Sequence, residues 1–565
     1  MHFKKGDLHL KKETKTVLTE KFLSRALGAF CNSLHDGDFY TPETYVSKDF
    51  FEGTKRFLKN PSKNGKWHCG YAKTDLTPDD ILKRDYFLGG YIVATNKFRN
   101  KVESVIDDMC ARAIALDDGS GRGVSLFCTV DCIGVTNADI RTIRRKFKEM
   151  YIAEYPKGKI ASVNIFSTHT HSCIDTEGLW TDFPFKMLRN AKRNYTGHGV
   201  PERGADEQYI RFLINAVTQT LMTACREMVP GELTLAQKEL SSKYFANKNR
   251  PSATSILNTL TRLAFTPDDP EKKPTLIVNM PAHPDVAGLA TEDGKGTGRE
   301  LCGDYIHYMG ETVAEAGCNL MFFNGAICAI YMSRGLSNDD LPLKRRYEES
   351  ARFGDEIAKI VLGMTKTLDE IKADKVLYDE KQIKWETERT EANGGKYTLW
   401  CENWQPVPEK KIAPLLNIRI KEVMIPITNP LICAMGKLNL ANFDVISTGK
   451  NAYSVNTEIG YIEFGKELKV ALVPGEYCCD LLMGGKSLTA AGSFTKTDFG
   501  IPTVREIFSE NTVAFGLAND AVGYIVPDND YTLGDPGDHY HEFVSLGKYT
   551  GSCVNKGFCE LKREL

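Results

Sequence analysis

Apolar runs of strand length alternate with amphipathic helical stretches along most of the chain, from about residue 66 onwards. Each run is short and bounded by polar residues, which is typical of strands buried in a sheet. The runs occupy residues 124–131 (VSLFCTVD), 161–171 (ASVNIFSTHTH), 275–283 (TLIVNMPAH), 319–330 (NLMFFNGAICAI), 468–476 (LKVALVPGE) and, less clearly, 514–525. We therefore expect a sheet that is assembled from widely separated parts of the sequence.

Helical patterns separate several of these runs. Thr136 is placed to cap a basic helix, and Asp206 begins a second helix whose single apolar stripe stops before Pro230-Gly231. A long charged amphipathic helix is predicted over residues 343–371. Strands that alternate with helices predict an α/β fold, with a mixed, largely parallel sheet and flanking helices.

One large domain accounts for most of the sequence. Residues 1–60 are polar and predict a partly helical N-terminal extension, whereas the strand and helix pattern extends through residues 61–565. Apolar residues make up 42% of the chain and charged residues 26%, which is the balance of a globular protein with a large core. Residues 382–403 are polar and irregular, and predict an excursion over the surface.

Charge and cysteine content restrict the partners and the compartment. The net charge of −2 gives no broad field that would recruit nucleic acid or anionic lipid. No apolar run follows the basic N-terminus, and no stretch reaches the roughly 20 apolar residues of a transmembrane helix. We therefore expect a soluble, cytoplasmic protein.

The 16 cysteines include no pair of CxxC motifs, so we interpret them as reduced thiols rather than as a zinc site.

Side chains of metal-ligand type follow the apolar runs. Asp131 ends the first run, His169 and His171 end the second, His283 ends the third and Glu476 ends a later one. Ligands of open α/β sheets bind beyond the carboxyl ends of the strands, so the sequence predicts a site there if the strands are neighbours. Taken singly, His283 and Glu476 are better explained as turn residues. Asp131 could cap a helix or orient a histidine.

The sharpest motif is residues 168–171 (THTH). Side chains two apart in a strand point to the same face, so His169 and His171 can reach one site. Neutral imidazole is a good zinc ligand, and a second imidazole nearby can donate a hydrogen bond or transfer a proton. A hydrogen-bonded structural pair explains the motif equally well on its own.

Two common catalytic motifs are missing from the sequence. The glycine-rich residues 294–298 (GKGTG) do not fit GxxxxGK[ST], and we interpret them as a loop. No GxSxG sequence is present, so the usual signature of a serine hydrolase is lacking.

The order of the motifs resembles the neutral, non-lysosomal ceramidase family. The most specific block is residues 167–172 (STHTHS), which matches the family's G-T-H-T-H-S-G sequence. Weaker similarities follow the family's order at residues 70–78 (GYAKTDLTP), 111–135, 280–284 (MPAHP), 301–305 (LCGDY), 473–476 (VPGE) and 516–525 (GLANDAVGYI). The resemblance extends from about residue 66 to about residue 548 and covers the family's catalytic domain.

This resemblance implies a zinc-dependent amidohydrolase of lipid metabolism, acting on a small N-acyl substrate that is ceramide-like or soluble. The zinc ion would be held by His169, His283, Glu476 and Tyr524. His171 and Tyr540 would be catalytic, since both could donate hydrogen bonds to the oxyanion and His171 could protonate the leaving amine. Zinc lowers the pKa of bound water towards about 7, so a zinc-activated water is the expected nucleophile.

Three departures from the family pattern affect this interpretation. Gly325 occupies the position of the family's serine, and Cys328 nearby is interpreted as a buried thiol. Residues 173–175 (CID) replace the Gly-Pro that follows His171 in the family. The sequence ends about 25 residues after Tyr540, so we expect no C-terminal immunoglobulin-like domain. A soluble amide is therefore at least as well supported as ceramide.

Two other functions remain open. The same zinc site could attack an ester or a lactone. A non-catalytic scaffold could keep the fold, which the missing serine favours and the retention of all six implied site residues opposes. The sequence determines neither the oligomeric state nor the metal, because His, Glu and Tyr ligands do not select zinc uniquely.

Overall fold

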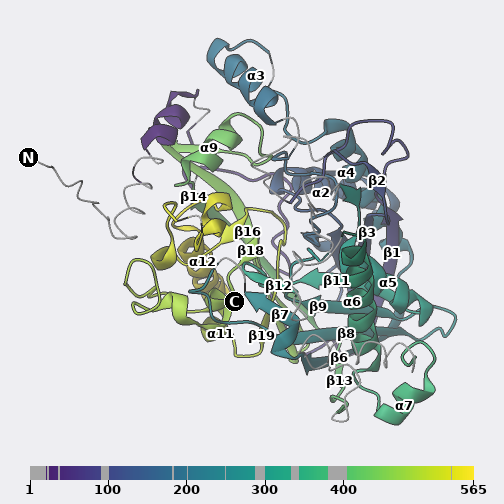
Figure 1. The fold of residues 1–565 in the computed structure, drawn as a ribbon. Helices are drawn as coiled ribbons and strands as arrows, with labels where there is room; N and C mark the ends of the chain where they lie inside the picture. Colours follow the sequence, from purple (N-terminus) through teal and green to yellow (C-terminus); the bar gives the residue numbers. More distant parts are fainter. Residues whose placement is uncertain are drawn as a thin grey trace, which may run out of the picture.

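The computed structural model describes residues 21, 25–35, 39–42, 44–90, 101–180, 183–199, 201–247, 250–286, 299–332, 343–379, 404–535 and 537–565. Its strands form two packed sheets, and helices cover the outer face of each sheet (Figure 1). In the described part of the chain, every helix is too short or too polar to cross a membrane.

A nine-stranded sheet forms one inner layer. Its strands, in spatial order, are β11 (Asn319–Asn324), β9 (Thr275–Met280), β8 (Thr259–Pro267), β6 (Val229–Glu239), β1 (Trp67–Asp75), β3 (Cys110–Asp117), β4 (Val124–Val130) and β5 (Ile160–Ser167), with β13 (Lys410–Ile412) beside β6. The predicted strands at residues 124–131, 161–171, 275–283 and 319–330 are thus confirmed as β4, β5, β9 and β11, all in one sheet.

The pairing in this sheet is mixed, as expected, but it is not largely parallel. Only β4 with β5 and β9 with β11 pair in parallel, and the other described pairs of the sheet are antiparallel. The physical reason is the length of the connections. Residues 118–123 join β3 to β4 and residues 268–274 join β8 to β9, and neither segment can hold the crossover helix that a parallel pair needs.

A five-stranded sheet packs against the first one. It contains β14 (Leu416–Pro426), β16 (Ala452–Phe464), β17 (Leu468–Leu472) and β19 (Thr512–Phe515), with β15 (Ile446–Gly449) beside β16. Alternate residues of each strand face opposite layers, because the side-chain period of a strand is two. Ile114 and Leu116 of β3 face the second sheet, whereas Ala113 and Ala115 pack under the helices.

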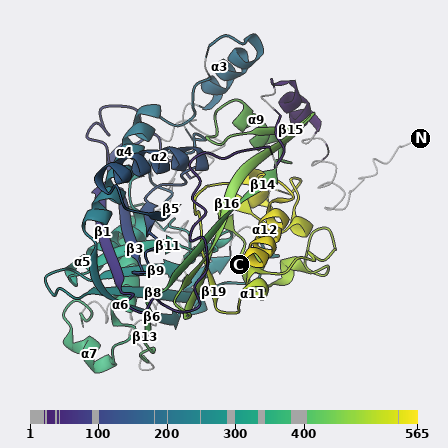
Figure 2. The same cartoon turned by 180° about the vertical axis from the view of Figure 1, so that it is seen from behind.

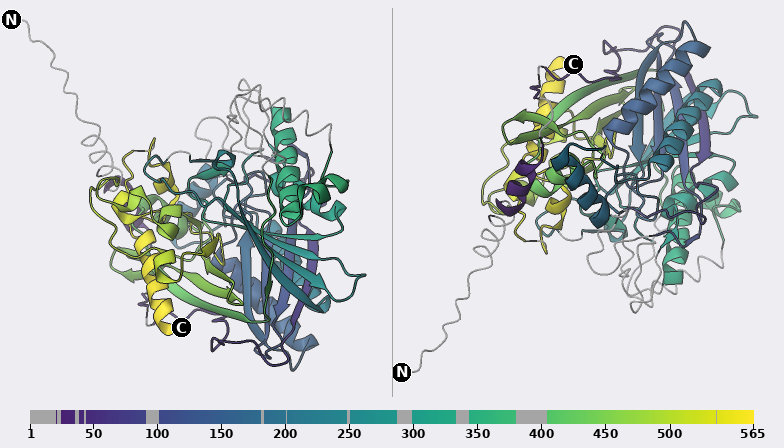
Figure 3. Two further views of the ribbon diagram at one scale, coloured as in Figure 1. Left: turned by 90° about the horizontal axis from the view of Figure 1, so that it is seen from below. Right: turned by 90° about the horizontal axis from the view of Figure 1, so that it is seen from above.

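Helices complete the two outer layers. The nine-stranded sheet is covered by α2 (Asn137–Glu154), α4 (Glu207–Arg226), α5 (Asp304–Glu315) and α6 (Leu343–Gly363), and the five-stranded sheet by α9 (Pro430–Lys437), α10 (Cys479–Met483) and α12 (Thr550–Glu564). Figures 2 and 3 show α12 and α6 on opposite outer sides of the molecule. The remaining elements are β2 (Ser104–Val105), α3 (Phe183–Thr196), β7 (Phe245–Asn247), β10 (Glu300–Leu301), β12 (Ile330–Met332), α7 (Leu368–Ala373), β18 (Glu476–Tyr477), α11 (Val504–Ile507) and β20 (Tyr524–Ile525).

Two of the three predicted helices have the expected starts. The Asp206 carboxylate caps α4 by accepting a hydrogen bond from the Tyr209 backbone N–H at 2.8 Å, and Thr136 stands at the N-cap of α2. The long helix predicted over residues 343–371 is instead two helices, α6 and α7. Thr367 starts α7 with a capping box, a signal that the continuous charged pattern obscured. The excursion predicted at residues 382–403 lies outside the described residues.

Part of the N-terminal region packs against the body of the protein. Cys31 and Leu34 lie in the same apolar cluster as Cys433 of α9, and Gly53 forms a bridge with Arg419 of β14. The division into an extension of residues 1–60 and a domain of residues 61–565 stays a prediction. All cysteines that the structure describes are free thiols, as expected.

Candidate metal centre

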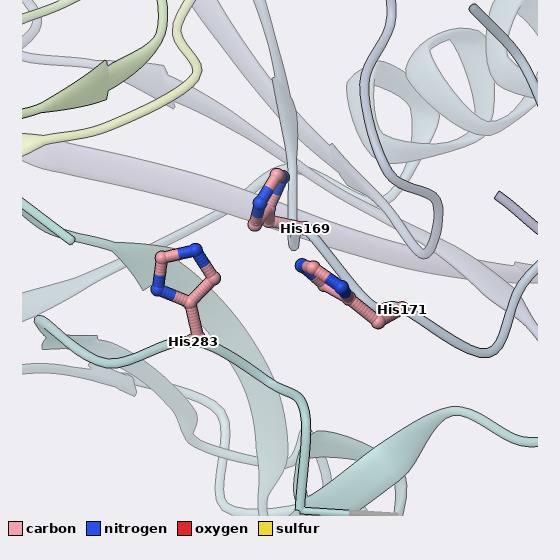
Figure 4. Close-up of side chains that lie close together, drawn as sticks. All are labelled: His169, His171 and His283. Carbon is pink, nitrogen blue, oxygen red and sulfur yellow. The ribbon is translucent and has the colours of Figure 1, made fainter. Parts of the chain in front are cut away.

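The three histidines singled out in the sequence meet in one buried place. His169 and His171 follow β5, and His283 follows β9. One ligand atom from each histidine lies within 4.8 Å of the others, and Figure 4 shows the three rings facing a common point. Glu476 reaches the same place from β18, which follows β17 of the second sheet. The predicted convergence at strand ends is therefore present.

A sharp turn, rather than strand alternation, directs His169 into the site. The strand β5 ends at Ser167, and His169 has a φ of 67°, in the left-handed region that non-glycine residues rarely adopt. The expectation that one strand face aims both histidines is therefore wrong. Backbone strain of this kind persists where the surrounding structure holds it, often at functional sites. His169 Nδ1 lies 2.7 Å from the backbone carbonyl oxygen of Ile133, which anchors the ring in this turn.

His283 is held by the short strand β12. Its backbone N–H donates to the Ile330 carbonyl oxygen at 3.0 Å, and its ring Nδ1 lies 2.9 Å from the same oxygen. Its ring also stacks on Tyr331, with centroids 4.3 Å apart and planes 9° apart. A carbonyl can only accept, so Nδ1 carries the proton in both His169 and His283. The Nε2 atoms are then available as ligands.

Glu476 meets both of these Nε2 atoms. Its Oε2 lies 2.9 Å from His283 Nε2 and 3.2 Å from His169 Nε2. Burial by itself raises the pKa of the Glu476 carboxyl, but His169 and His283 outweigh burial and bring the pKa below its usual range. Burial in turn lowers the pKa of His169, and the opposing Glu476 carboxylate brings that pKa above its ordinary value. The two histidines therefore stabilise Glu476 in its ionised form.

His171 lies beside His169, His283 and Glu476, and its pKa is shifted in the opposite direction to that of His169. Its ring centroid is 4.8 Å from that of His169 and 5.6 Å from that of His283. Burial, followed by the charges of His169 and His283, holds the pKa of His171 well below its ordinary value, so the ring is neutral. Gly90 packs on it so closely that a Cβ there would lie 2.9 Å from the ring. The position of this imidazole therefore depends on a residue without a side chain.

Tyr524 approaches the site from the strand paired with Glu476. Strands β18 and β20 are parallel, and Glu476 stands opposite Tyr524. Tyr524 also hydrogen-bonds to Tyr331, the residue that stacks on His283. Burial, followed by the Glu476 charge, raises the pKa of Tyr524 well above its usual value. Tyr540, in a short 3₁₀ helix (Tyr540–Val544), is half-buried, and its ring centroid is 6.4 Å from that of Tyr524.

His541 is a site residue that the sequence did not reveal. Its ring packs edge-on against Tyr524, with centroids 4.5 Å apart, and its side chain is fully buried. Both of its ring nitrogens lack a hydrogen-bond partner among the residues that the structure describes. Burial, followed by the charge of Arg250, lowers the pKa of His541 to about 3. Only its position directly after Tyr540 could have drawn attention to it.

Asp131 does not orient a histidine. Its two oxygens each lie 2.9 Å from Arg112 Nη1, and one also accepts the Cys110 backbone N–H. Backbone carbonyls take the orienting role instead, at Ile133 and Ile330. Asp131 is therefore part of a buried ion pair inside the sheet.

The structure leaves no room for a side chain at position 325. A Cβ on Gly325 would lie 2.7 Å from the Cβ of Pro281, closer than real side chains approach. Cys328 is buried, and desolvation, followed by a hydrogen bond that its thiol donates to Cys478, raises the pKa of this thiol well above normal. Cys328 is therefore a poor nucleophile in this setting.

The donor set fits a divalent metal ion. Two imidazole Nε2 atoms with anchored Nδ1–H groups and one carboxylate with a lowered pKa converge in a buried space, and His169 Nε2 has no other hydrogen-bond partner in the described part of the chain. Nitrogen and carboxylate ligands, oriented by outer hydrogen bonds, are the usual ligands of catalytic zinc.

Comparisons with known proteins identify the fold. No family model and no curated protein sequence matches the chain. Among solved structures, the neutral ceramidase from Pseudomonas aeruginosa is similar, with a TM-score of 0.55 and 13% identity over 89% of this chain and 75% of that one. A ceramidase complexed with C2 is similar as well, with a TM-score of 0.56 and 13% identity over 88% of this chain and 75% of that one. The chain therefore has a neutral ceramidase-like fold.

Proposed function

We propose, from the neutral ceramidase-like fold, that this chain is a metal-dependent hydrolase that cleaves an amide bond. One observation carries the proposal: Glu476 Oε2 lies 2.9 Å from His283 Nε2 and 3.2 Å from His169 Nε2, and all three residues are buried. A buried carboxylate that faces two imidazole Nε2 atoms, each ring anchored through Nδ1 by a backbone carbonyl, is a typical set of metal ligands.

Four residues would hold the metal: His169, His283, Glu476 and Tyr524. When bound, zinc would supply Lewis-acid polarisation of the scissile carbonyl and a water activated at neutral pH. The fit of Tyr524 rests on its place opposite Glu476 and its hydrogen bond to Tyr331. Its high pKa without metal means that binding would displace a proton from the phenol.

The protein's own groups would handle the substrate and the proton. His171 is neutral, so one ring nitrogen can donate a hydrogen bond to the oxygen that becomes negative during attack. The same proton can pass to the leaving amine as the C–N bond breaks. Tyr540 is half-buried, and burial followed by Glu476 raises its pKa, so it remains a hydroxyl donor at neutral pH.

The substrate proposed is an N-acyl compound, either ceramide-like or soluble. A serine nucleophile has no support, because Gly325 has no room for a side chain beside Pro281. An ester or a lactone is the alternative substrate, since the same metal-activated attack would suit both. Paired short-chain N-acyl and O-acyl substrates with the same acyl group would separate the two activities.

The experiment that tests the proposal compares bound metal and turnover in four proteins. Wild type should hold about one zinc, His283→Ala should lose it, and Glu476→Gln should lose turnover and most of the metal. His198→Ala, at an exposed position, is the matched control and should behave as wild type. Folded wild type that takes up no zinc would overturn the proposal. Zinc without turnover on any acyl substrate would instead favour the non-catalytic scaffold.

A further inference from the structure

The helix α3 stands clear of the two-sheet body (Figures 1 and 2). It contacts the body along one side, and its C-terminal end also hydrogen-bonds to Ser33 and His35. Asn190 on that side is buried, and its Nδ2 donates to the carbonyl oxygens of Leu438 at 2.8 Å and Glu202 at 2.6 Å. Met187 and Ala191 pack against the apolar cluster around α9. The opposite side of the helix therefore faces outwards.

That outer side carries large apolar residues. The exposed fractions are 57% for Phe185 and 64% for Leu188. Tyr195 is 55% exposed, but its hydroxyl lies 2.7 Å from Ser33 Oγ, so it borders this face rather than forming it. A spacing of three residues places Phe185 and Leu188 on one face of the helix. Single exposed apolar residues are common on soluble proteins, but a row of them on one protruding helix marks an interaction surface.

The same helix is strongly basic. Its sequence, FPFKMLRNAKRNYT, contains four basic residues and no acidic residue. Lys186 is bound to the carbonyl oxygens of Arg203 and Gly204. Arg189 and Arg193 share one carboxylate, Glu202, at 2.9 Å each, and Lys192 is exposed. A single acid thus faces two arginines, and the outer face keeps a positive charge despite the chain's net charge of −2.

We propose that α3 binds the surface of an anionic phospholipid bilayer. Interfacial helices of this kind insert Phe and Leu at the level of the upper acyl chains and keep Lys and Arg among the head groups. Phe185 and Leu188 would take the first role, and Arg189 and Lys192 would take the second, because long basic side chains can keep their charged ends among the head groups. Charge complementarity selects an anionic rather than a neutral surface.

The position of α3 links this surface to the candidate metal centre. The largely buried residues 172–180 follow His171 directly, and α3 begins at Phe183. In the sequence, the proposed membrane-binding helix therefore follows closely on the segment that leaves the site. If the proposed function holds, a membrane-binding helix at this position favours a substrate whose acyl chain resides in a membrane. Membrane binding itself does not depend on that function.

The test uses the full chain and two kinds of vesicle, phosphatidylcholine alone and phosphatidylcholine mixed with phosphatidylserine. Wild type should co-sediment with the mixed vesicles, and salt should weaken this binding. Phe185→Ser with Leu188→Ser should reduce binding about tenfold or more. Arg189→Glu with Lys192→Glu should abolish the preference for the anionic vesicles. Phe212→Ser removes a similarly exposed apolar side chain from α4, at 39% exposure, and should leave binding unchanged.

Two controls keep the result interpretable. Each variant should retain the wild-type unfolding midpoint, zinc content and turnover of a short water-soluble substrate. If wild type binds vesicles but has no turnover, the catalytic proposal fails and the membrane proposal stands. A Phe185→Trp variant should show blue-shifted emission when mixed vesicles are added. Wild type that binds neither vesicle, or a double serine variant that binds as wild type does, overturns the inference. Self-association lost in the serine variant, without vesicle binding, would assign the face to a second copy and also overturn it.

Discussion

Backbone carbonyls, rather than acidic side chains, orient both of the histidines that face Glu476. The carbonyls of Ile133 and Ile330 each accept from an Nδ1–H, so the ligand geometry depends on the path of the loop after β4 and on strand β12. No substitution of a side chain can remove those acceptors. We therefore expect activity to be most sensitive to mutation at small residues that let the backbone pack closely against a site histidine.

Gly90→Ala is the first prediction at this scale. Gly90 has a φ of +116°, and an added Cβ would lie 2.9 Å from the His171 ring. We expect turnover to fall about tenfold or more, because a small displacement of a catalytic group is costly. Zinc content should stay near that of wild type, since His171 is not among the proposed ligands.

Gly121→Ala is the matched control for backbone strain. Gly121 also has a positive φ, +76°, but an added Cβ there would meet nothing within 4 Å. Both variants should lose stability by roughly 1 kcal/mol. Equal turnover in the two variants would show that the position of His171 is unimportant.

Asp520 gives a pH prediction. Burial raises the pKa of Asp520 to about 6, above the value of about 3.9 in an unfolded chain. Between these values the folded protein keeps a proton that the unfolded chain releases. The free energy of unfolding therefore decreases as pH rises through this window and stays lower above it.

Asp520→Asn should remove this dependence. Its amide oxygen can still accept from the Asn137 and Ala521 N–H groups, which Asp520 Oδ1 now does at 2.9 Å each. Relative to wild type, the variant should gain up to about 3 kcal/mol between about pH 4 and about pH 7, measured by urea unfolding at both pH values. A constant difference at the two values would contradict the assignment.

At the scale of elements, α2 joins the two sheets. Arg144 of α2 makes two hydrogen bonds to Glu458 of β16, at 2.6 and 2.8 Å, and donates to the Val163 carbonyl oxygen of β5 at 2.9 Å. Both charged side chains are almost fully buried. A buried ion pair contributes more to the arrangement of the elements than to net stability, but losing one partner is expensive.

Glu458→Gln should therefore destabilise the protein by about 3–5 kcal/mol. The matched control is Glu564→Gln, which breaks the exposed pair between Lys421 and Glu564 and should cost under about 1 kcal/mol. Urea unfolding of both variants measures the difference. Similar small losses in the two variants would show that water reaches the Arg144 site.

At the scale of the whole molecule, the candidate metal centre draws on both sheets. His169 and His283 follow strands of the nine-stranded sheet, whereas Glu476 follows β17 of the five-stranded sheet. The two sheets otherwise meet through an apolar interface that includes Phe127 and Phe464, with ring centroids 6.4 Å apart. A metal ion at the site would thus connect the layers.

Metal removal should consequently lower global stability. A ligand that binds only the folded state adds about 2.7 kcal/mol at one hundred times its dissociation constant. We expect the unfolding midpoint of wild type to rise with zinc and to fall with a chelator. In Glu476→Gln the midpoint should be independent of zinc, while His198→Ala should respond as wild type does. An unchanged wild-type midpoint would argue against a metal that joins the sheets.

Much of the fold followed from local patterns. Apolar runs at residues 124–131 and 275–283 became β4 and β9, and the Asp206 cap began α4, because periodicity and capping act over a few residues. The excess of antiparallel pairs was not foreseen, since neighbours in a sheet are chosen by packing between distant segments.

The sequence by itself determined which side chains could form the site. The positions of His169, His171, His283 and Glu476 after apolar runs predicted a meeting place at strand ends, and a resemblance to a known family added Tyr524 and Tyr540. Only the tertiary structure decided how they meet. The left-handed turn at His169, the carbonyl at Ile330 and the burial of His541 arise from contacts between distant segments. Local sequence cannot encode such contacts, because each depends on the packing of the whole chain.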